Sequence, residues 1–405
     1  MKVAAIISEY NPFHNGHEYQ VKKIREMLGA DTAVIAIMSG NFTQRGEIAV
    51  ADKTVRARAA LECGVNLVLE LPFPFSMSSA EFFAKSGVKI AHEIGVVDYL
   101  VFGSESGNVS ELSDIAAITE SEEYSLTLDS LTNDKEYKDY GYPELCQIAI
   151  SKVYGKTIDR DFFTPNNILA IEYIKAILNL GSGIIPLTIR REGAGYLDII
   201  NPMTEYQSAS AIREELSDGN LSALNFVPDN AKEIYLNTIN EGRMPSDVSR
   251  LDYSVISSFR LNSPTANPDI QDAAGGLYNR LCEMSAEATS ISSLTAMTDT
   301  KKYTKARIRR AIWNTYFGVT SSDVRALPSY TQVLAMDNIG RSVLKIIKKT
   351  SDFPVITKPS SYREFGEDVI KQKETSIKAD TIYGLTLKNP YSGRFALTFT
   401  PYVKD

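Results

Sequence analysis

Short apolar runs alternate with amphipathic segments along the first quarter of the chain. The apolar runs cover 3–7, 32–38, 65–71 and 96–102, and the segments with helical spacing between them cover 17–28, 52–61 and 79–94. Short buried strands that alternate with helices predict a parallel sheet with right-handed crossovers. Ligands bind such sheets at the carboxyl ends of the strands, which directs attention to the residues that follow each run.

The same alternation continues to about residue 215. A Ser-, Glu- and Asp-rich stretch at 108–145 predicts polar helices that cover the sheet. The spacing at 166–178 predicts a further helix, and the apolar run at 184–190 predicts a further strand. A helix that begins near Ser210 completes this half.

Beyond about residue 216 the pattern becomes mostly helical. Turn-forming residues interrupt it at Leu261-Asn262-Ser263-Pro264, and 381–403 alternates as short strands do. The predicted fold class is therefore α/β, with a Rossmann-like parallel sheet followed by a mainly helical C-terminal half with a few terminal strands. Because 405 residues are too many for one ordinary core, we expect two domains, 1–215 and 216–405.

The composition is that of a globular protein of the reducing cytoplasm. Hydrophobic residues make up 43% and charged residues 23% of the chain, and no apolar run is long enough to span a membrane. The apolar start at 3–7 stops at Ser8, too early for a signal sequence. The cysteines form no disulfide framework or zinc pattern, and we expect them to be core residues: Cys63, Cys146 and Cys282.

The candidate chemistry lies at Glu9–His17, where the first predicted strand meets the first helix. An anion placed there meets unpaired backbone N–H groups and the positive end of the helix dipole. Gly16 lacks a Cβ, so a nucleotide can lie on the backbone. His14 and His17 are two of the three histidines in the chain, and they can donate to phosphate oxygens as charge builds during displacement.

Two other interpretations of these histidines stay open. They could be metal ligands, although no nearby Cys or carboxylate cluster completes a site. They could also sit in an ordinary turn. The third histidine, His92, lies on an apolar helical segment, where we expect a core residue.

The segment resembles the HxGH signature of the nucleotidyltransferase and class I synthetase superfamily, whose members have a Rossmann-like sheet and act at the α-phosphate of a nucleoside triphosphate. A second superfamily element holds the outgoing phosphates. Ser208-Ala209-Ser210-Ala211-Ile212-Arg213 resembles a weakened version of it, which implies Ser210 and Arg213 as phosphate ligands. The alternative is a simple N-cap with an exposed arginine.

Further motifs resemble the bacterial tRNA(Met) cytidine acetate ligases along the full length of the chain. They are Ser8–Gln20, Met38–Glu47, Leu69–Phe73, Phe102–Glu105, Pro165–Leu169, Arg191 with Gly193–Tyr196, and Tyr303-Thr304 with the basic helix that follows. Singly most of these motifs are not specific, but together they are.

The resemblance implies an ATP site at Gly103, at Asn166 or Asn167, at Arg191 and along the N-terminal segment. The residues of that segment are Ile7, Ser8, Glu9, Tyr10, Asn11, Pro12, Phe13, His14, Asn15, Gly16, His17, Glu18, Tyr19 and Gln20. The asparagine pair could instead cap a helix, and Arg190 could exchange roles with Arg191.

The resemblance also implies a reaction. Acetate attacks the α-phosphate of ATP, which is expected to carry Mg²⁺, and pyrophosphate leaves. The acetyl group of acetyl-adenylate then passes to N4 of the wobble cytidine of elongator tRNA(Met), giving N4-acetylcytidine. His14 and His17 are the implied catalytic residues.

A basic segment indicates where RNA could bind, although the net charge of −7 argues against binding by the whole surface. Residues 301–325 contain seven Lys or Arg and one acid. On a helical wheel one arc is basic and the opposite arc is apolar. The basic arc holds Lys302, Lys305, Arg307, Arg309 and Arg310, and the apolar arc holds Ile308, Ala311, Ile312 and Thr315. Trp313 could stack on an unpaired base or anchor the core.

Three other cations carry weaker expectations. Arg45, in the loop at 39–47, could meet the tRNA or the acyl-adenylate, or stabilise the loop. Lys53 and Arg56, on the next helix, are expected on a solvated face.

Two other functions stay open. An adenylyltransferase that makes a small dinucleotide-type cofactor would need only the first half of the chain. An RNA-binding protein with a regulatory nucleotide site would have little use for both histidines.

Overall fold

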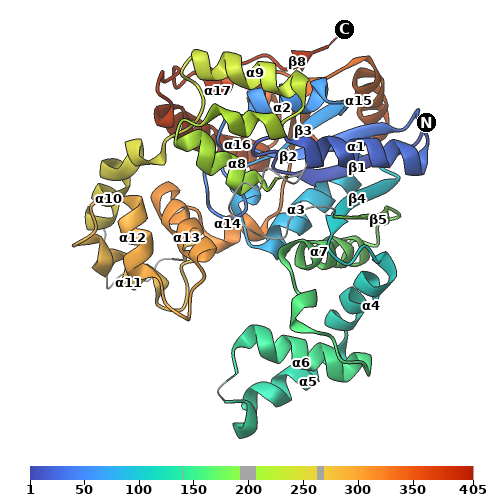
Figure 1. The fold of residues 1–405 in the computed structure, drawn as a ribbon, viewed down its shortest axis with the longest axis vertical. Helices are drawn as coiled ribbons and strands as arrows, with labels where there is room; N and C mark the ends of the chain where they lie inside the picture. Colours follow the sequence, from blue (N-terminus) through green and yellow to red (C-terminus); the bar gives the residue numbers. More distant parts are fainter. Residues whose placement is uncertain (139, 192–206, 262–268, 405) are drawn as a thin grey trace. The chain divides into compact units, whose positions relative to one another are not determined.

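The computed structural model describes residues 1–138, 140–191, 207–261 and 269–404 (Figure 1). These residues form two compact units. The first unit combines Met1–Val97 with Gly193–Asp405, and the second is Asp98–Glu192. The boundaries of these compact units do not coincide with residue 215. The division into a catalytic domain at 1–215 and a tRNA-binding region at 216–405 stays a prediction. No described helix is both long and apolar enough to traverse a lipid bilayer.

A parallel sheet lies at the centre of the first unit. Its strands β1 (Val3–Ser8), β2 (Ala33–Ser39) and β3 (Leu67–Leu71) are hydrogen-bonded in that order and are almost wholly buried, as their continuous apolar runs predict. The helix α1 (Asn15–Leu28) follows β1, α2 (Lys53–Glu62) follows β2, and α3 (Ala80–Glu93) follows β3. Ser8 pairs with Met38 and Ser39 with Leu71, so the carboxyl ends of the three strands meet at one edge.

The C-terminal half adds strands to this same sheet. β6 (Thr331–Met336) runs antiparallel to β3, and β7 (Val355–Ile356) and β8 (Tyr402–Val403) pair with β6 in parallel. α15 (Asn338–Thr350) packs on β2 and β3. The mainly helical C-terminal half is confirmed. The expectation of short strands throughout 381–403 is wrong: this part holds the end of α16 (Glu367–Tyr383), α17 (Phe395–Thr398) and only the two residues of β8.

Most other C-terminal helices gather around a second apolar core, which includes Phe259, Leu281 and Trp313. They are α10 (Asp252–Leu261), α11 (Leu277–Ser285), α12 (Ile291–Thr298), α13 (Lys305–Phe317) and α14 (Ser321–Arg325), drawn from yellow to orange in Figure 1. The predicted break begins where α10 ends; residues 262–264 lie outside the described residues. The helix predicted near Ser210 is α8 (Ala209–Ser217), and α9 (Asp229–Asn240) packs on α2.

The second unit holds a parallel strand pair, β4 (Tyr99–Ser104) and β5 (Ile185–Arg190). Its helices are α4 (Val109–Thr119), α5 (Glu122–Asn133), α6 (Tyr142–Tyr154) and α7 (Pro165–Asn179). The polar helices predicted at 108–145 are present. However, α5 and α6 pack on each other around Leu131, Leu145 and Ala149, so they build a small core of their own and do not cover the strands.

The three cysteines are unpaired. Cys63 and Cys282 are buried core residues as expected, and Cys146 is half-buried.

Candidate nucleotide site

The two histidines cap the start of α1 with their own ring nitrogens. His14 is the N-cap residue, and its Nδ1 accepts from the Gly16 N–H at 3.1 Å. Nδ1 of His17 accepts from the His14 N–H at 3.2 Å. The two rings stack with their centroids 3.8 Å apart. A ring nitrogen that accepts a hydrogen bond carries no proton, so each neutral imidazole has its proton on Nε2 and presents that atom as the donor.

Aromatic packing fixes the loop that leads into this cap. Tyr10, at φ +47°, lies 4.8 Å from Phe13 and 4.9 Å from His17 between ring centroids. The Phe13 N–H donates to the buried hydroxyl of Tyr235 in α9. A Cβ on Gly16 would lie 2.9 Å from Cε1 of His14, so this glycine makes room for the histidine ring itself.

The implied N-terminal ATP segment runs from the buried sheet to a half-buried helix turn. Ile7, Tyr10, Asn11, Pro12, Phe13 and His14 are buried, whereas Ser8, Glu9 and residues 15–20 are half-buried. Asn11 accepts from the Val50 N–H through Oδ1. Its buried Nδ2 has no hydrogen-bond partner within the described parts of the chain. An unsatisfied buried donor is uncommon, and here it lies in the segment expected to bind a nucleotide.

The predicted phosphate residues of α8 come to this segment. Arg213 donates to the backbone oxygen of Asn11 at 2.9 Å and to Oγ of Ser210 at 3.2 Å. Ser208 caps the helix by accepting from the Ala211 N–H. The alternative of a plain cap with an exposed arginine is therefore wrong for Arg213, whose side chain is only 18% exposed.

A neighbouring acid, Glu47, completes the surroundings of Arg213. It ends the loop that follows β2, and its Oε2 lies 2.7 Å from Nη2 of Arg213. The same loop is tied to the N-terminal segment, because the Gln44 N–H donates to Oε1 of Glu9 at 2.9 Å. Partial burial raises the pKa of the Glu9 carboxyl, and the Gln44 N–H opposes that shift. These hydrogen bonds of Glu9 and Glu47 could not be predicted from the sequence, because the partners are far apart along the chain.

Lys53 and Arg56 are buried, and the expectation of a solvated face is wrong for both. Lys53 is 3% exposed and its ammonium lies 2.6 Å from carboxylate oxygens of both Glu70 and Asp380. Arg56 is fully buried, and its guanidinium donates to backbone oxygens, among them that of Glu9. Each cation is enclosed because acceptors from several elements surround it.

In the second unit, the implied ATP residues gather around the end of β4. Arg191 directly follows β5, and its N–H donates to the Ser104 oxygen. A Cβ on Gly103 would lie 3.3 Å from Cγ of Arg191. Arg190 lies instead beside Gly107, whose φ is +64°. The arrangement favours Arg191 over Arg190 as the residue next to Gly103.

Both asparagines of α7 bind the loop that follows β4. Asn167 is 2% exposed; its Oδ1 accepts from the N–H groups of Glu105 and Ser106, and its Nδ2 donates to Phe162. Nδ2 of Asn166, which is half-buried, donates to Oε1 of Glu105 at 2.6 Å. Neither caps α7, since Thr164 occupies that position. Asn167 thus holds the loop with both its Oδ1 and its Nδ2, and Asn166 is the more accessible of the two.

Comparison with known proteins places this geometry in a family. A model of the HIGH Nucleotidyl Transferase family matches residues 1–395. The tRNA(Met) cytidine acetate ligase of Acetivibrio thermocellus is 37% identical, over 99% of either chain, and that of Thermoanaerobacter sp. is 36% identical over 96% of either. The chain belongs to the HIGH nucleotidyl transferases, in the tRNA(Met) cytidine acetate ligase branch.

A solved structure of this branch agrees over the whole length. Thermotoga maritima TmcAL bound with alpha-thio ATP is 31% identical and superposes with a TM-score of 0.90, over 100% of this chain and 99% of that one. The apo form of the same protein gives 0.91 at 30% identity. The family resemblance and the fold class expected from the sequence are therefore confirmed. The Gly193–Tyr196 motif lies outside the described residues.

The basic helix of this family member presents fewer cations to solvent than its sequence predicts. The apolar arc is buried as expected at Ile308, Ala311 and Ile312. Arg310, expected on the basic face, is 6% exposed and forms a two-pronged ion pair with Asp272. This corrects its predicted exposure: the arginine neutralises a buried acid.

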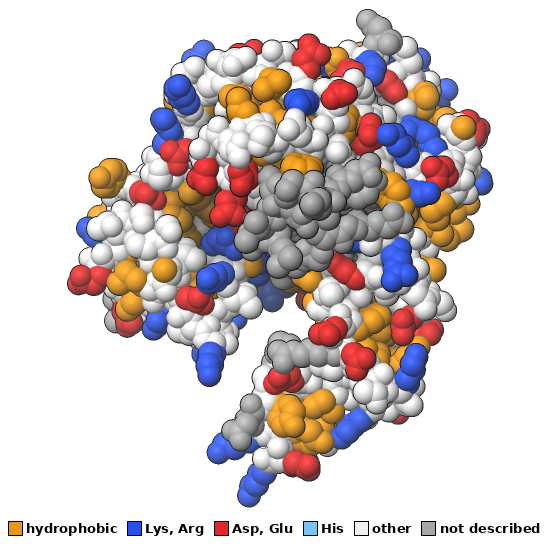
Figure 2. All heavy atoms as spheres, viewed as in Figure 1, with side chains coloured by type: hydrophobic (Ala, Val, Ile, Leu, Met, Phe, Trp, Pro, Cys, Tyr) orange, Lys and Arg blue, Asp and Glu red, His pale blue; other side chains and the backbone are white. Residues whose placement is uncertain are grey.

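Two more cations of the basic arc hold the backbone before α11. Arg307 donates to the oxygens of Asp272 and Ala274, and Lys302 donates to that of Gly275. Lys305 has a side chain 70% exposed, 3.9 Å from Asp299. Arg309 is half-buried and paired with Glu47. On the face drawn in Figure 2, described Lys and Arg side chains are interspersed with acids.

The structure also decides between the two roles considered for Trp313, and it differs from the expectation for His92. Trp313 is 2% exposed, and its Nε1–H donates to the Gly46 oxygen at 3.2 Å, so it anchors the core and does not offer a stacking surface. His92 lies exposed in the last turn of α3, which corrects the prediction of a core residue.

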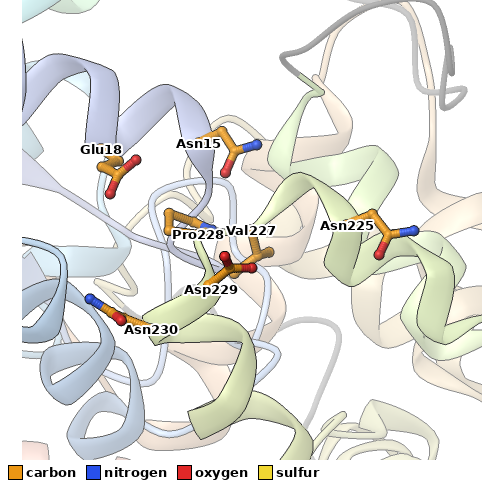
Figure 3. A pocket seen from close by; sticks show the side chains of 7 residues that line it. All are labelled: Asn15, Glu18, Asn225, Val227, Pro228, Asp229 and Asn230. Atoms are coloured by element: carbon orange, nitrogen blue, oxygen red, sulfur yellow. The ribbon is translucent and has the colours of Figure 1, made fainter.

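One pocket of about 360 Å³ opens beside the first turn of α1 (Figure 3). Asn15 and Glu18 contribute from α1, and the other lining residues are Asn225, Val227, Pro228, Asp229 and Asn230. Two acids and no cation line it, so it is unsuited to a triphosphate. No group of three or more His, Cys, Asp or Glu in the described ranges could hold a metal ion.

Proposed function

We propose that this chain activates acetate with ATP and acetylates N4 of the wobble cytidine in elongator tRNA(Met). The observation that carries the proposal is the paired histidine cap at the sheet's carboxyl edge, where both Nδ1 atoms accept hydrogen bonds, so that a neutral ring carries its proton on Nε2. The names of the relatives support the tRNA substrate, and the ATP analogue bound by Thermotoga maritima TmcAL supports the nucleotide. Such a reaction belongs in the cytoplasm, where tRNA is modified.

In the first step, a carboxylate oxygen of acetate attacks the α-phosphorus of ATP. The new P–O bond forms as the bond to the bridging oxygen breaks, and pyrophosphate leaves with that oxygen. His14 and His17 donate from Nε2 to phosphate oxygens as negative charge builds. The stacked geometry keeps the two donors side by side, which suits adjacent phosphates.

In the second step, N4 of the cytidine attacks the acetyl carbon of the mixed anhydride. The C–O bond to AMP breaks, and N4 loses a proton, so the products are N4-acetylcytidine and AMP. An aromatic amine is a weak nucleophile. The driving force therefore comes from the anhydride, and the protein contributes placement.

The ATP contacts follow from the residues already described. Residues 7–20 are the contacts proposed in the first unit. Gly103, Asn166 and Arg191 are those proposed in the second unit, where Asn167 holds the loop. Ser210 and Arg213 would bind the outgoing phosphates. Mg²⁺ would enter with the triphosphate, since the described residues offer no metal cluster of their own.

Fewer cations of the basic arc are proposed to contact tRNA than the sequence alone implies. Lys302 and Lys305 are the exposed cations of the basic arc, and Arg307 and Arg309 are half-buried. Arg310 would contribute only by holding Asp272 in place.

One assay tests the proposal: pyrophosphate release from ATP with acetate, with and without tRNA(Met) transcript. Release that requires acetate, with acetyl transfer to the wobble cytidine when tRNA is added, is the expected result. Release only with a nucleotide or a pantetheine phosphate would establish the cofactor adenylyltransferase instead, and no release under any condition would leave an RNA-binding protein.

Histidine variants locate the chemistry in the same assay. His14→Ala and His17→Ala are expected to lose adenylate formation by about 10²-fold or more, since each removes a donor to the developing charge, while tRNA affinity is retained. His92→Ala is the matched control, because it removes the exposed histidine of α3. Loss of adenylate formation and of tRNA affinity together would contradict separate sites.

A further inference from the structure

Glu47 is shared between two arginines that the sequence assigns to different substrates. Its Oε2 lies 2.7 Å from Nη2 of Arg213, and its Oε1 lies 2.6 Å from Nη1 of Arg309. Arg213 belongs to the α8 element expected to bind phosphates of ATP, and Arg309 belongs to the basic helix α13. The three side chains are 27%, 18% and 32% exposed, in the order Glu47, Arg213, Arg309, so water screens the two ion pairs only in part.

The loop that carries Glu47 is fixed to the backbone of α13. A Cβ on Gly46 would lie 2.6 Å from the Arg310 nitrogen, so the loop touches the helix directly. The Gly46 oxygen accepts from Trp313, and the Gln44 oxygen accepts from Arg310. Gly46 has φ +72° and donates to the Thr43 oxygen, which closes the loop into a tight turn.

The opposite side of the same loop is fixed to the nucleotide segment, by which we mean residues 7–20. The Gln44 N–H donates to Glu9, and Arg213 links Glu47 to the backbone oxygen of Asn11. A continuous set of hydrogen bonds thus runs from α13 through one carboxylate to the loop that precedes the two histidines. No RNA is needed to complete it.

The charges in this set determine what each side chain does. One carboxylate faces two guanidiniums, and each guanidinium holds a different oxygen of it. Arg309 therefore orients the carboxylate, and the oriented carboxylate holds Arg213 against the Asn11 oxygen. Without Arg309, Glu47 can rotate to offer both oxygens to Arg213, which draws that guanidinium toward the loop and away from the nucleotide segment.

We propose that Arg309 is a positioning residue for the nucleotide reaction, acting on Arg213 through Glu47, in addition to any contact it makes with tRNA. The inference rests on the proposed function, because it assigns Arg213 to the phosphates of ATP. Its consequence is that a residue of the RNA-facing helix controls ATP use when RNA is absent.

The test is acetate-dependent ATP–pyrophosphate exchange without tRNA, together with calorimetric binding of a non-hydrolysable ATP analogue. Arg309→Ala is expected to raise KM for ATP and the dissociation constant of the analogue by about five- to tenfold, with kcat changed less than about twofold, as for lost coupling between neighbouring charges. Arg309→Lys is expected to restore part of the loss, because a lysine retains the pair with Glu47. His92→Ala, which removes an exposed side chain of α3 that is not a member of this set of hydrogen bonds, is the control and is expected to change neither value.

A double variant distinguishes positioning from a general loss of structure. If Arg309 acts through Glu47, Arg309→Ala combined with Glu47→Ala weakens nucleotide binding no more than Glu47→Ala alone. Additive losses would overturn the proposal. So would an Arg309→Ala protein that binds the analogue as the wild type does and loses only tRNA affinity.

The proposed function can fail separately from this inference. A wild-type protein without acetate-dependent exchange would refute the acetate reaction, whereas analogue binding would still compare Arg309→Ala with the wild type. Equal affinities there would refute the positioning role on their own.

Discussion

The buried side chain of Arg56 supports the loop between β1 and α1, which carries His14. Its guanidinium donates to the backbone oxygen of Glu9, which follows β1, to that of Ser39, the last residue of β2, and to that of Gly40, which follows β2. Its Nε donates to the Ala51 oxygen. One planar group thus ties together the carboxyl ends of two parallel strands, which is where the loop with His14 begins.

We expect Arg56→Lys to damage this loop although it keeps the charge. A single ammonium cannot reach oxygens on both strands in the fork geometry of a guanidinium, so at least one buried carbonyl loses its partner, at about 1–3 kcal/mol of unfolding free energy. Urea denaturation measures that loss, and ATP–pyrophosphate exchange should fall with it. Arg58→Lys, exposed on the same helix, is the control; equal stability of Arg56→Lys and wild type would contradict the role.

At this scale the sequence predicted that the two histidines lie where a strand turns into a helix, but not that their rings cap the helix, nor which residues support the loop. His14 and His17 are readable because the strand, turn, glycine and helix that create the site are contiguous. Lys53 and Arg56 looked like solvated cations because their acceptors come from distant residues, such as Asp380. Which cations a fold will enclose depends on long-range packing, and local spacing does not contain it.

At the scale of elements, the side chains of α13 have two different roles, which the helical wheel did not distinguish. Arg310 and Trp313 hold neighbouring segments in place, and Lys305 faces solvent. The wheel assigned Arg310 to the basic arc because it cannot represent Asp272, which approaches from the segment before α11.

A pair of variants separates these tasks. Arg310→Ala leaves the Asp272 carboxylate buried without its partner, and we expect it to lower the unfolding free energy by about 3–5 kcal/mol. Lys305→Ala should leave stability unchanged and reduce the slope of log affinity for tRNA against log salt by about 1 or less. Thermal melts and binding at several salt concentrations measure the two effects; a stable Arg310→Ala protein that binds tRNA weakly would reverse the assignment.

The strands of the C-terminal half show where element prediction reaches its limit. The apolar residues of β6 are few and lie among helices. They form a strand because they pair with the edge of β3, where Leu67 lies opposite Met336, more than 250 residues away along the chain. The alternation at 381–403 is longer, but the end of α16 and the short helix α17 take up apolar residues there. Short patterns of this kind are decided by the available partner.

At the scale of the whole molecule, a buried ionic network joins both ends of the chain within the first unit. Lys53 of α2 bridges Glu70 of β3 and Asp380 of α16, and Asn41 donates to Asp380 as well. The network lies beneath the loop after β2, so the position of α16 bears on the candidate site. The network is one of several contacts that bring residues from both ends of the sequence into the first unit.

Lys53→Met should therefore destabilise the whole first unit. The substitution preserves the length of the side chain but leaves two buried carboxyl groups without their shared cation, and we expect a loss of about 3–5 kcal/mol in unfolding free energy. Because α2, β3 and α16 share the network, denaturation followed at Trp313 and by far-UV circular dichroism should shift together. A loss confined to one probe would show that the network is local.

Lys373 gives this network a pH dependence whose sign can be worked out. It is fully buried in α16, donates to Gln332, and lies near Lys53. Burial, with a smaller contribution from Lys53, lowers the pKa of Lys373 from 10.5 to about 8. Between these two pH values the unfolded chain binds a proton at Lys373 that the folded chain does not bind. The contribution of Lys373 to the free energy of unfolding therefore rises as the pH increases from about 8 toward 10.5, by about 3 kcal/mol at most. Below pH 8 this contribution is at its least favourable. The difference in unfolding free energy between the wild type and Lys373→Met isolates this contribution from other groups that titrate in the same range. It should grow in favour of the wild type across that interval; a difference that stays constant with pH would mean that Lys373 keeps its ordinary pKa in the folded protein.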